Sequence, residues 1–373
     1  MSIFKDDKKR LGISKKRSVE ESNYTYLNSS SLDHIEKIRK KFNLLFDLYQ
    51  HSEEEKNKIL TQIRSRDDVG YYSASFELII NAILRKLGFH VEVHPNLDNE
   101  SGKHPDFLVT APHGEKFYLE LVTGIENNDT HINRLKEKLK KIKVPDSKYI
   151  LNSNIVGRIK SSKTIDDIIK KVNIWLNNEN KSYVEIPFLY KEDDFTLEIS
   201  TEYNCPITAS CQIISDLALD DKMLKSLESK ASRYGSLDYP YVIAISFRPS
   251  DFSLDLSKII FDNAMSAIER ALFGKPNLIN SKYYEKGFWY YIENKSLKFR
   301  NEHVSAVWYF DELTVERLDQ DIENALYLSS HNGTIFPTCL MQVVNIKYIH
   351  SFNHEGIEFG KYKEHINLYD IFS

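Results

Sequence analysis

The stretch that decides the fold runs from residue 73 to residue 122. It contains a segment with apolar residues at helical spacing, SASFELIINAILRKLG (73–88), followed by FHVEVHP (89–95), PDFLVT (105–110) and KFYLELV (116–122). The first segment ends at Gly88, a residue typical of helix C-termini. The other three are short, rich in β-branched or aromatic residues, and bounded by Pro, Gly and polar loops. These patterns predict one helix followed by three strands.

The chain outside this stretch predicts a larger α/β fold. Residues 216–310 contain a helix that ends at Gly235 and the apolar run YPYVIAIS (239–246), which is typical of a strand buried on both faces. We therefore predict a central mixed sheet flanked by helices, built from residues 66–124 and 216–310.

Four further regions complete the predicted organisation. Residues 125–215 interrupt the α/β pattern of the core. A basic run, an amphipathic helix and two paired strands in this region predict an inserted α+β subdomain. The others are a polar, basic and partly disordered arm (1–30), an N-terminal helical region (31–65) and a C-terminal extension without a clear pattern (311–373).

The composition excludes several protein classes. The chain has 373 residues with 41% hydrophobic and 28% charged residues, so it can bury a large core. Its three cysteines, Cys205, Cys211 and Cys339, have no zinc-ligand spacing and predict a reducing cytoplasm. There is no apolar run of about 18 residues and no signal-peptide pattern. We therefore expect a cytoplasmic protein with no membrane partner.

Three acidic residues occupy unusual positions in the decisive stretch. Glu120 shares a strand face with apolar Tyr118 and Val122, and Asp106 opens the neighbouring strand. Glu77 lies inside an otherwise apolar helical segment. A carboxylate in apolar surroundings is unfavourable unless it binds a cationic group, and carboxylate oxygens are preferred ligands of Mg²⁺. We therefore predict a metal site made by these acids.

The helix, the Pro105–Asp106 pair and the later Glu120 resemble the PD-(D/E)xK, or restriction-endonuclease-like, nuclease superfamily. The resemblance implies a core of helix, three strands, helix and strand, and hydrolysis of DNA phosphodiesters with Mg²⁺ or Mn²⁺. Asp106 and Glu120 would bind the metal with the Leu121 carbonyl, and Glu77 would bind the metal or its water. The chain also resembles a group of bacterial proteins with this core, so the setting would be restriction, repair or phage defence.

One position departs from the family pattern. The family usually carries a lysine two residues after the second acid, where this chain has Val122. A candidate replacement is Lys230, which lies four residues before Tyr234 on one helix face. This spacing resembles the Gln-x-x-x-Tyr motif of the exonuclease branch attached to recombination helicases. We predict that Lys230 acts on the attacking water or the developing charge, and that Tyr234 contacts phosphate.

The expected macromolecular partner is DNA, with RNA not excluded. The run RLKEKLKKIKVPDSK (134–148) has seven basic and two acidic residues. We predict that Arg134, Lys138 and Lys141 grip the phosphate backbone, although such a run is more often a solvated face. A second copy of the chain or a defence-system protein are further expected partners.

Two other functions fit the same sequence. Val122 favours a non-catalytic module that keeps the nuclease-like fold and binds DNA or protein without cutting. The insertion allows a scaffold protein that binds a partner chain. Each site residue also has an ordinary structural interpretation: a helix-surface acid for Glu77, a turn cap for Asp106, an exposed edge residue for Glu120, a solvated lysine for Lys230 and a core aromatic for Tyr234.

Overall fold

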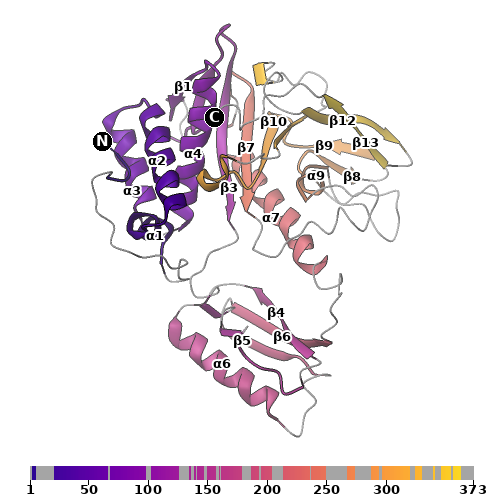
Figure 1. Cartoon of the computed structure of the whole chain (residues 1–373). Coiled ribbons are helices and arrows are strands. Elements are labelled where there is room, and N and C mark those ends of the chain that lie inside the picture. The colour runs from indigo at the N-terminus through magenta and orange to yellow at the C-terminus, as the bar shows by residue number, and fades with distance from the viewer. Residues whose placement is uncertain are drawn as a thin grey trace. The chain divides into compact units, whose positions relative to one another are not determined.

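The computed structural model divides the chain into two compact units. One contains residues 1–15, 23–126 and 211–373, and the other contains residues 16–22 and 127–210 (Figure 1). The structure describes the following residues: 2–5, 21–65, 68–97, 102–125, 134–135, 138–139, 141–146, 149–156, 159, 161–178, 186–192, 195–203, 213–235, 237–248, 267–273, 287–293, 296–319, 324–329, 339–340, 346–353 and 356–362.

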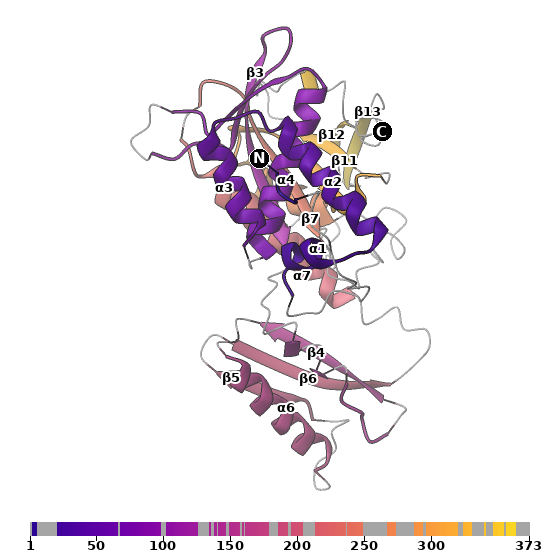
Figure 2. The ribbon, with the colours of Figure 1, turned by 60° about the vertical axis from the view of Figure 1, so that its left-hand side comes forward.

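Four helices form the N-terminal part of the first unit (Figure 2). Their bounds are α1 (Asn23–Ser29), α2 (Asp33–Leu48), α3 (Glu53–Ile63) and α4 (Asp68–Lys86). Helix α3 begins at Ser52, whose hydroxyl accepts a hydrogen bond from the Glu55 amide, a typical N-cap. Helices α2 and α3 both pack on α4, which buries most of its residues, so α4 is the central helix of this layer.

An eight-stranded mixed sheet is the centre of the first unit. Its order is β1-β2-β3-β7-β10-β11-β12-β13. The strand bounds are β1 (His90–Val93), β2 (Phe107–Thr110), β3 (Lys116–Ile125), β7 (Tyr241–Arg248), β10 (Val304–Asp311), β11 (Asn324–Leu328), β12 (Ile346–Asn353) and β13 (Gly356–Tyr362). Strands β1, β2 and β3 are antiparallel neighbours, whereas β3, β7 and β10 run parallel.

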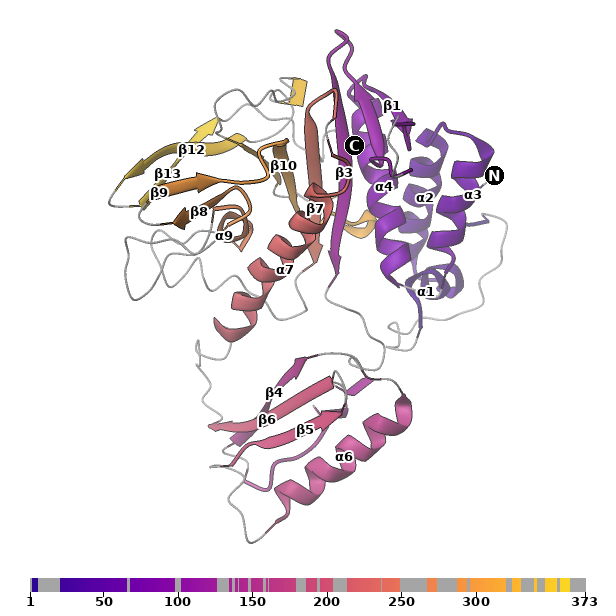
Figure 3. The ribbon, with the colours of Figure 1, turned by 180° about the vertical axis from the view of Figure 1, so that it is seen from behind.

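The two faces of the sheet belong to different hydrophobic cores. Phe107 and Leu119 pack with α2, α3 and α4, whereas Tyr118 and Val122 pack with α7 (Ile213–Ala231) and α9 (Ala267–Phe273). Figure 3 shows α7 lying along β7 and β3. Strand β7 contributes residues to both cores, as the apolar run 239–246 predicts. Helices therefore cover both faces of the sheet, which confirms the predicted α/β class with a mixed central sheet.

Strand β3 extends beyond the strand that pairs with its first half. Its residues Lys116–Leu119 pair with β2, whereas its pairing with β7 continues to Ile125. The overhang needs Gly124, because a Cβ there would lie 1.7 Å from the Phe247 ring across the pair. Beyond Leu119, the β2-facing edge of β3 is thus open to other groups, and this edge positions the candidate site.

The second unit is a small α+β structure. It contains β4 (Tyr149–Val156), α6 (Ser162–Leu176), β5 (Phe188–Glu192) and β6 (Phe195–Tyr203). The strands form an antiparallel sheet of order β4-β6-β5. One face of α6 and one face of β6 share a core that includes Ile165, Ile168, Leu197 and Ile199. The apolar face of the amphipathic helix α6 and the apolar face of the alternating strand β6 are thus both buried.

Several details differ from the sequence predictions. Ile3 and Phe4 are buried and donate their amides to Asn43 Oδ1, so the start of the predicted arm is part of the core, while residues 6–20 lie outside the described residues. The C-terminal region contributes β11, β12 and β13, which the sequence pattern did not reveal. The remaining described elements are β8 (Tyr290–Glu293), β9 (Ser296–Phe299) and the 3₁₀ turn Val315–Arg317. Among the described residues, no helix is long and apolar enough to span a bilayer.

Candidate active site

A pocket of about 260 Å³ opens beside the overhanging half of β3. Its walls come from α3, α4, the residues flanking β1 and β2, β3 itself and α7. The lining residues are Glu55, Lys58, Ile59, Gln62, Ser73, Phe76, Glu77, His94, Asp106, Leu121, Thr123 and Lys230. The pocket therefore brings together three of the predicted site residues, Glu77, Asp106 and Lys230, from elements far apart in sequence.

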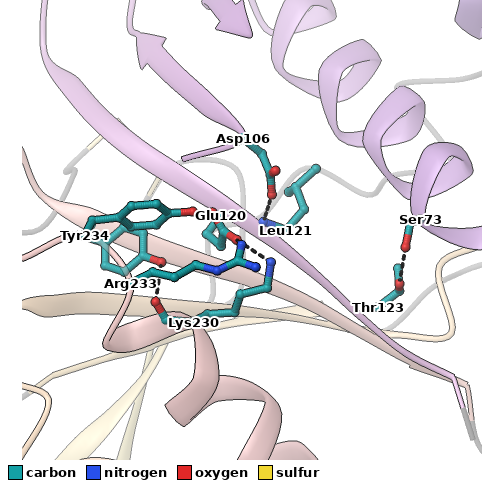
Figure 4. A network of polar contacts seen from close by, with 9 residues as sticks. Ser73, Asp106, Glu120, Leu121, Thr123, Lys230, Arg233 and Tyr234 are labelled. Carbon is teal, nitrogen blue, oxygen red and sulfur yellow. Dashed lines mark hydrogen bonds and ion pairs between the residues drawn. The ribbon is translucent and has the colours of Figure 1, made fainter. Parts of the chain in front are cut away.

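Asp106 lies at the point where β2 and β3 separate. The register that pairs Phe107 with Leu119 places Asp106 opposite Glu120. The Leu121 amide donates a hydrogen bond of 2.7 Å to Asp106 Oδ2, so the aspartate occupies the open edge of β3 (Figure 4). Burial, and secondarily the charge of Glu120, raise the pKa of Asp106 above its usual value.

The Leu121 carbonyl faces the same edge as Asp106. In a strand, the N–H and C=O of one residue point to the same side, and the Leu121 N–H points toward Asp106. The backbone groups of the even-numbered residues of β3 instead face β7, since the Tyr118 amide donates to the Pro240 carbonyl. Asp106 and the Leu121 carbonyl thus present oxygen atoms at one position, beside the pocket.

Glu120 is fully buried and is held by one side chain from the last turn of α7 and by two from the turn that follows the helix. Lys230 Nζ donates to Glu120 Oε1, and an Arg233 guanidinium nitrogen donates to the same oxygen at 3.0 Å. The Tyr234 hydroxyl donates to Oε2 at 2.6 Å (Figure 4). A buried carboxylate is stable only when its charge and lone pairs are satisfied, and these three donors satisfy both oxygens.

Two side chains from outside the helix hold the last turn of α7 in place. The Tyr241 hydroxyl donates to the Lys230 carbonyl at 3.2 Å, and His303 Nε2 lies 2.7 Å from the Ala231 carbonyl. Carbonyls at a helix C-terminus lack intrahelical partners, so these contacts terminate the helix at a defined position. They thereby set the direction in which Lys230, Arg233 and Tyr234 project.

Glu77 reaches the pocket from the opposite face of the sheet. It is partly buried on α4, and the Tyr49 hydroxyl donates to its Oε1 at 2.6 Å. Desolvation raises the pKa of Glu77 to about 8, and the charge of Asp106 acts in the same direction. Burial therefore favours the protonated form of Glu77 as long as no cation is bound beside it.

The predicted metal shell of three acids is only partly assembled. Asp106 lies within electrostatic reach of both Glu120 and Glu77. In the part of the chain that the structure describes, however, no three His, Cys, Asp or Glu side chains form a group that could hold a metal ion. The physical reason is that Glu77 approaches from the α4 face, whereas Glu120 points to the α7 face.

A histidine next to Asp106 has an unusual backbone conformation. His94 has φ of 48°, its amide donates to the Asp106 carbonyl at 2.9 Å, and its Nδ1 lies 3.0 Å from Glu55 Oε2. The His104 ring lies beside it, with the ring centroids 4.6 Å apart. A non-glycine residue in the left-handed region is uncommon and costs about 1 kcal/mol or more. This strained turn therefore fixes the main chain that carries Asp106.

Several polar residues of the site were not identified from the sequence, among them Tyr49, Ser73, Thr123 and Arg233. The Ser73 and Thr123 hydroxyls are hydrogen-bonded at 2.9 Å across the pocket wall (Figure 4). Helical spacing does contain a signal for Arg233, since it lies three residues after Lys230. Tyr49 is 28 residues from Glu77, and no local pattern indicates that contact.

The remaining predicted residues have other surroundings. The Tyr234 hydroxyl, predicted to contact phosphate, is bonded to Glu120. Arg134, Lys138 and Lys141 belong to the second unit, where Lys138 forms an ion pair with Asp166. Their predicted role in gripping a phosphate backbone stays a prediction.

Comparisons with protein-family models, with curated proteins and with solved structures found no match to this chain.

Proposed function

We propose that this pocket is the active site of a metal-dependent nuclease that hydrolyses phosphodiester bonds in DNA. The observation that carries the proposal is the cluster at the open edge of β3, where Asp106 and Glu120 lie opposite each other and Lys230 reaches both Glu120 and the pocket. Within the first unit, the element order α4, β1, β2, β3, α7, β7 also supports it, because it follows the order expected of a restriction-endonuclease-like core. The setting we propose is bacterial restriction, repair or phage defence.

Oxygen donors of the kind that a hard divalent cation such as Mg²⁺ or Mn²⁺ prefers lie at this edge, although Glu120 is directed at its three donors on the α7 side and does not line the pocket. These oxygen donors are the Asp106 carboxylate, the Leu121 carbonyl on the same edge, and the Glu120 carboxylate opposite Asp106. The raised pKa of Asp106 supports a cation site, because burial and the nearby charge of Glu120 both disfavour a negative charge that a cation would stabilise. A cation held there would offset negative charge on the phosphodiester and lower the pKa of a bound water.

The protein side chains have separate roles in this proposal. Asp106 and Glu120 supply the anionic oxygens. The Lys230 ammonium lies at the pocket wall, where it can orient the attacking water or stabilise charge on the phosphate oxygens. Glu77 accepts a hydrogen bond from the Tyr49 hydroxyl, and its raised pKa, about 8, favours the form without charge, so its role would be to position the metal-bound water.

The test is cleavage of supercoiled, linear duplex and single-stranded DNA, and of RNA, with Mg²⁺, Mn²⁺ or a chelator. We expect metal-dependent cutting by the intact protein and a loss of at least about a hundredfold in Asp106→Asn and in Lys230→Met. Glu92→Gln is the matched control, because Glu92 is an exposed acid on β1. Equal cutting by all four proteins would contradict the proposal and indicate a contaminating nuclease.

A second candidate function is a non-catalytic module that binds nucleic acid. Two observations favour it: Val122 stands where the family lysine is expected and packs in the α7-side core, and three donors already satisfy Glu120. DNA binding that needs no metal, together with no cleavage of any substrate, would support this function over the nuclease.

A further inference from the structure

Two cations share one oxygen of Glu120, and they differ in how much of each side chain meets solvent. The Lys230 side chain is 21% exposed, the Arg233 side chain is 42% exposed, and Glu120 is not exposed at all. Lys230 is therefore an inner cation that also lines the pocket, and Arg233 is an outer cation at the surface end of the same cluster.

Glu120 does not depend on Arg233 for its charge balance. If Arg233 turned away, the carboxylate would keep an ion pair with Lys230 on Oε1 and the Tyr234 hydroxyl on Oε2. Both oxygens would still be satisfied, and a cation would still face the buried charge. The protein can thus release the Arg233 side chain without leaving an unpaired buried group.

The chemistry of the side chain indicates what it would bind when released. A guanidinium has five N–H donors in a planar fork that matches two oxygens of a phosphate, and it stays charged at every working pH. Arg233 uses one terminal nitrogen on Glu120 and also contacts the Tyr234 hydroxyl, while much of its side chain remains in solvent. Its position, three residues after Lys230, keeps it beside the proposed site of hydrolysis.

We propose that Arg233 binds a phosphate of the nucleic-acid strand next to the one being hydrolysed, exchanging its bond to Glu120 for that phosphate. This inference rests on the proposed function, and it assigns Arg233 to substrate binding. The side chain holds Glu120 in the free protein and the strand in the complex. The exchange conserves charge, because the guanidinium leaves one anion for another.

The test measures binding without cleavage. Fluorescence anisotropy would follow labelled single-stranded and duplex DNA titrated with full-length protein in chelator and in Ca²⁺, over a series of salt concentrations. Arg233→Ala should weaken binding about tenfold at low salt and reduce the slope of log affinity against log salt by roughly one. Arg233→Lys should restore the slope but only part of the affinity, because the charge remains without the fork.

The control is Lys225→Ala, which removes an exposed positive charge from α7, the helix that precedes Arg233. It should leave affinity and slope nearly unchanged, and thermal unfolding should show that every variant is folded. The inference is overturned if the intact protein binds and cuts DNA while Arg233→Ala keeps the same affinity and slope. If the intact protein neither binds nor cuts, the proposed function fails with it, so the two failures are distinguishable.

Discussion

Glu120 and Glu77 are two desolvated carboxylates on either side of Asp106, and the protein treats them differently. Glu120, on the α7 face, has two cations and a tyrosine hydroxyl. Glu77, on the α4 face, has a tyrosine hydroxyl, and desolvation raises its pKa to about 8. The comparison teaches that burial of one acid is compensated by two ion pairs and a hydroxyl, whereas burial of the other is compensated by one hydroxyl and raises its pKa. The two acids near Asp106 are thus stabilised in different ways.

Glu120→Gln should cause the largest loss of unfolding free energy. The substitution removes the anion with which both Lys230 and Arg233 form ion pairs and leaves two neighbouring cations, one of them mostly buried. We expect a loss of unfolding free energy on the order of 3 kcal/mol, since breaking a buried ion pair from one side is strongly destabilising. Urea unfolding at neutral pH measures it. A loss below about 0.5 kcal/mol, the usual range for surface sites, would show that Glu120 is not the centre of this network.

At alkaline pH, Glu77→Gln should raise the unfolding free energy, which is the opposite of the effect of Glu120→Gln. The pKa of Glu77 is raised to about 8 in the folded protein and has an ordinary value in the unfolded chain. Its contribution to stability is therefore complete below about pH 4.5 and is lost as pH rises through 8, with a slope of up to about 1.4 kcal/mol per pH unit. The variant has no carboxyl group at this position, so its stability lacks this dependence on pH.

The measurement is urea unfolding of both proteins at pH 5 and pH 8.5, in chelator. The stability difference, variant minus intact protein, should become more positive by on the order of 2 kcal/mol, a value reduced from the full slope because solvent reaches Glu77 through the pocket. Glu120→Gln is the comparison protein. A difference that stays constant with pH would mean that Glu77 is ionised like an exposed acid.

The sequence predicted this site unevenly, and the reason lies in the range of each contact. Glu120 could be found because the neighbours that share its strand face, Tyr118 and Val122, are apolar, so its burial follows from strand parity alone. Lys230 could be found from helical spacing with Tyr234. The phenol of Tyr49 could not, because the bond to Glu77 depends on how α4 packs against the end of α2. Local patterns thus revealed the ion-paired acid in more detail than the protonated one.

The fold shows the same limit. The segments from α4 to β3 were predictable because each carries its own period and turn residues, and β7 because it is apolar on both faces. Strand β11 is five residues long and buried throughout, so it has no alternating pattern. Its place between β10 and β12 depends on pairing with both of these strands, which periodicity within β11 cannot reveal.

A matched pair of tyrosine variants gives the smallest effect and separates the two acids most directly. Tyr49→Phe removes the hydroxyl that Glu77 accepts from, whereas Tyr234→Phe removes one of three donors to Glu120. We expect Tyr49→Phe to lower the unfolding free energy by about 1 to 2 kcal/mol, and Tyr234→Phe by about 1 kcal/mol or less, because the two cations remain. Each variant keeps the ring and its packing, so the difference reports the hydroxyl group.

The tyrosine pair also tests how the acids are coupled to catalysis. If Lys230 and Arg233 hold Glu120 in place, Tyr234→Phe should keep most of the cleavage activity that Asp106→Asn abolishes, and unfolding in urea should rank Tyr49→Phe below Tyr234→Phe in stability. The reverse ranking would mean that the phenol, and not the cations, satisfies Glu120. In that case the contrast between an ion-paired acid and a protonated one would not hold, and both carboxyl groups would depend on a tyrosine in the same way.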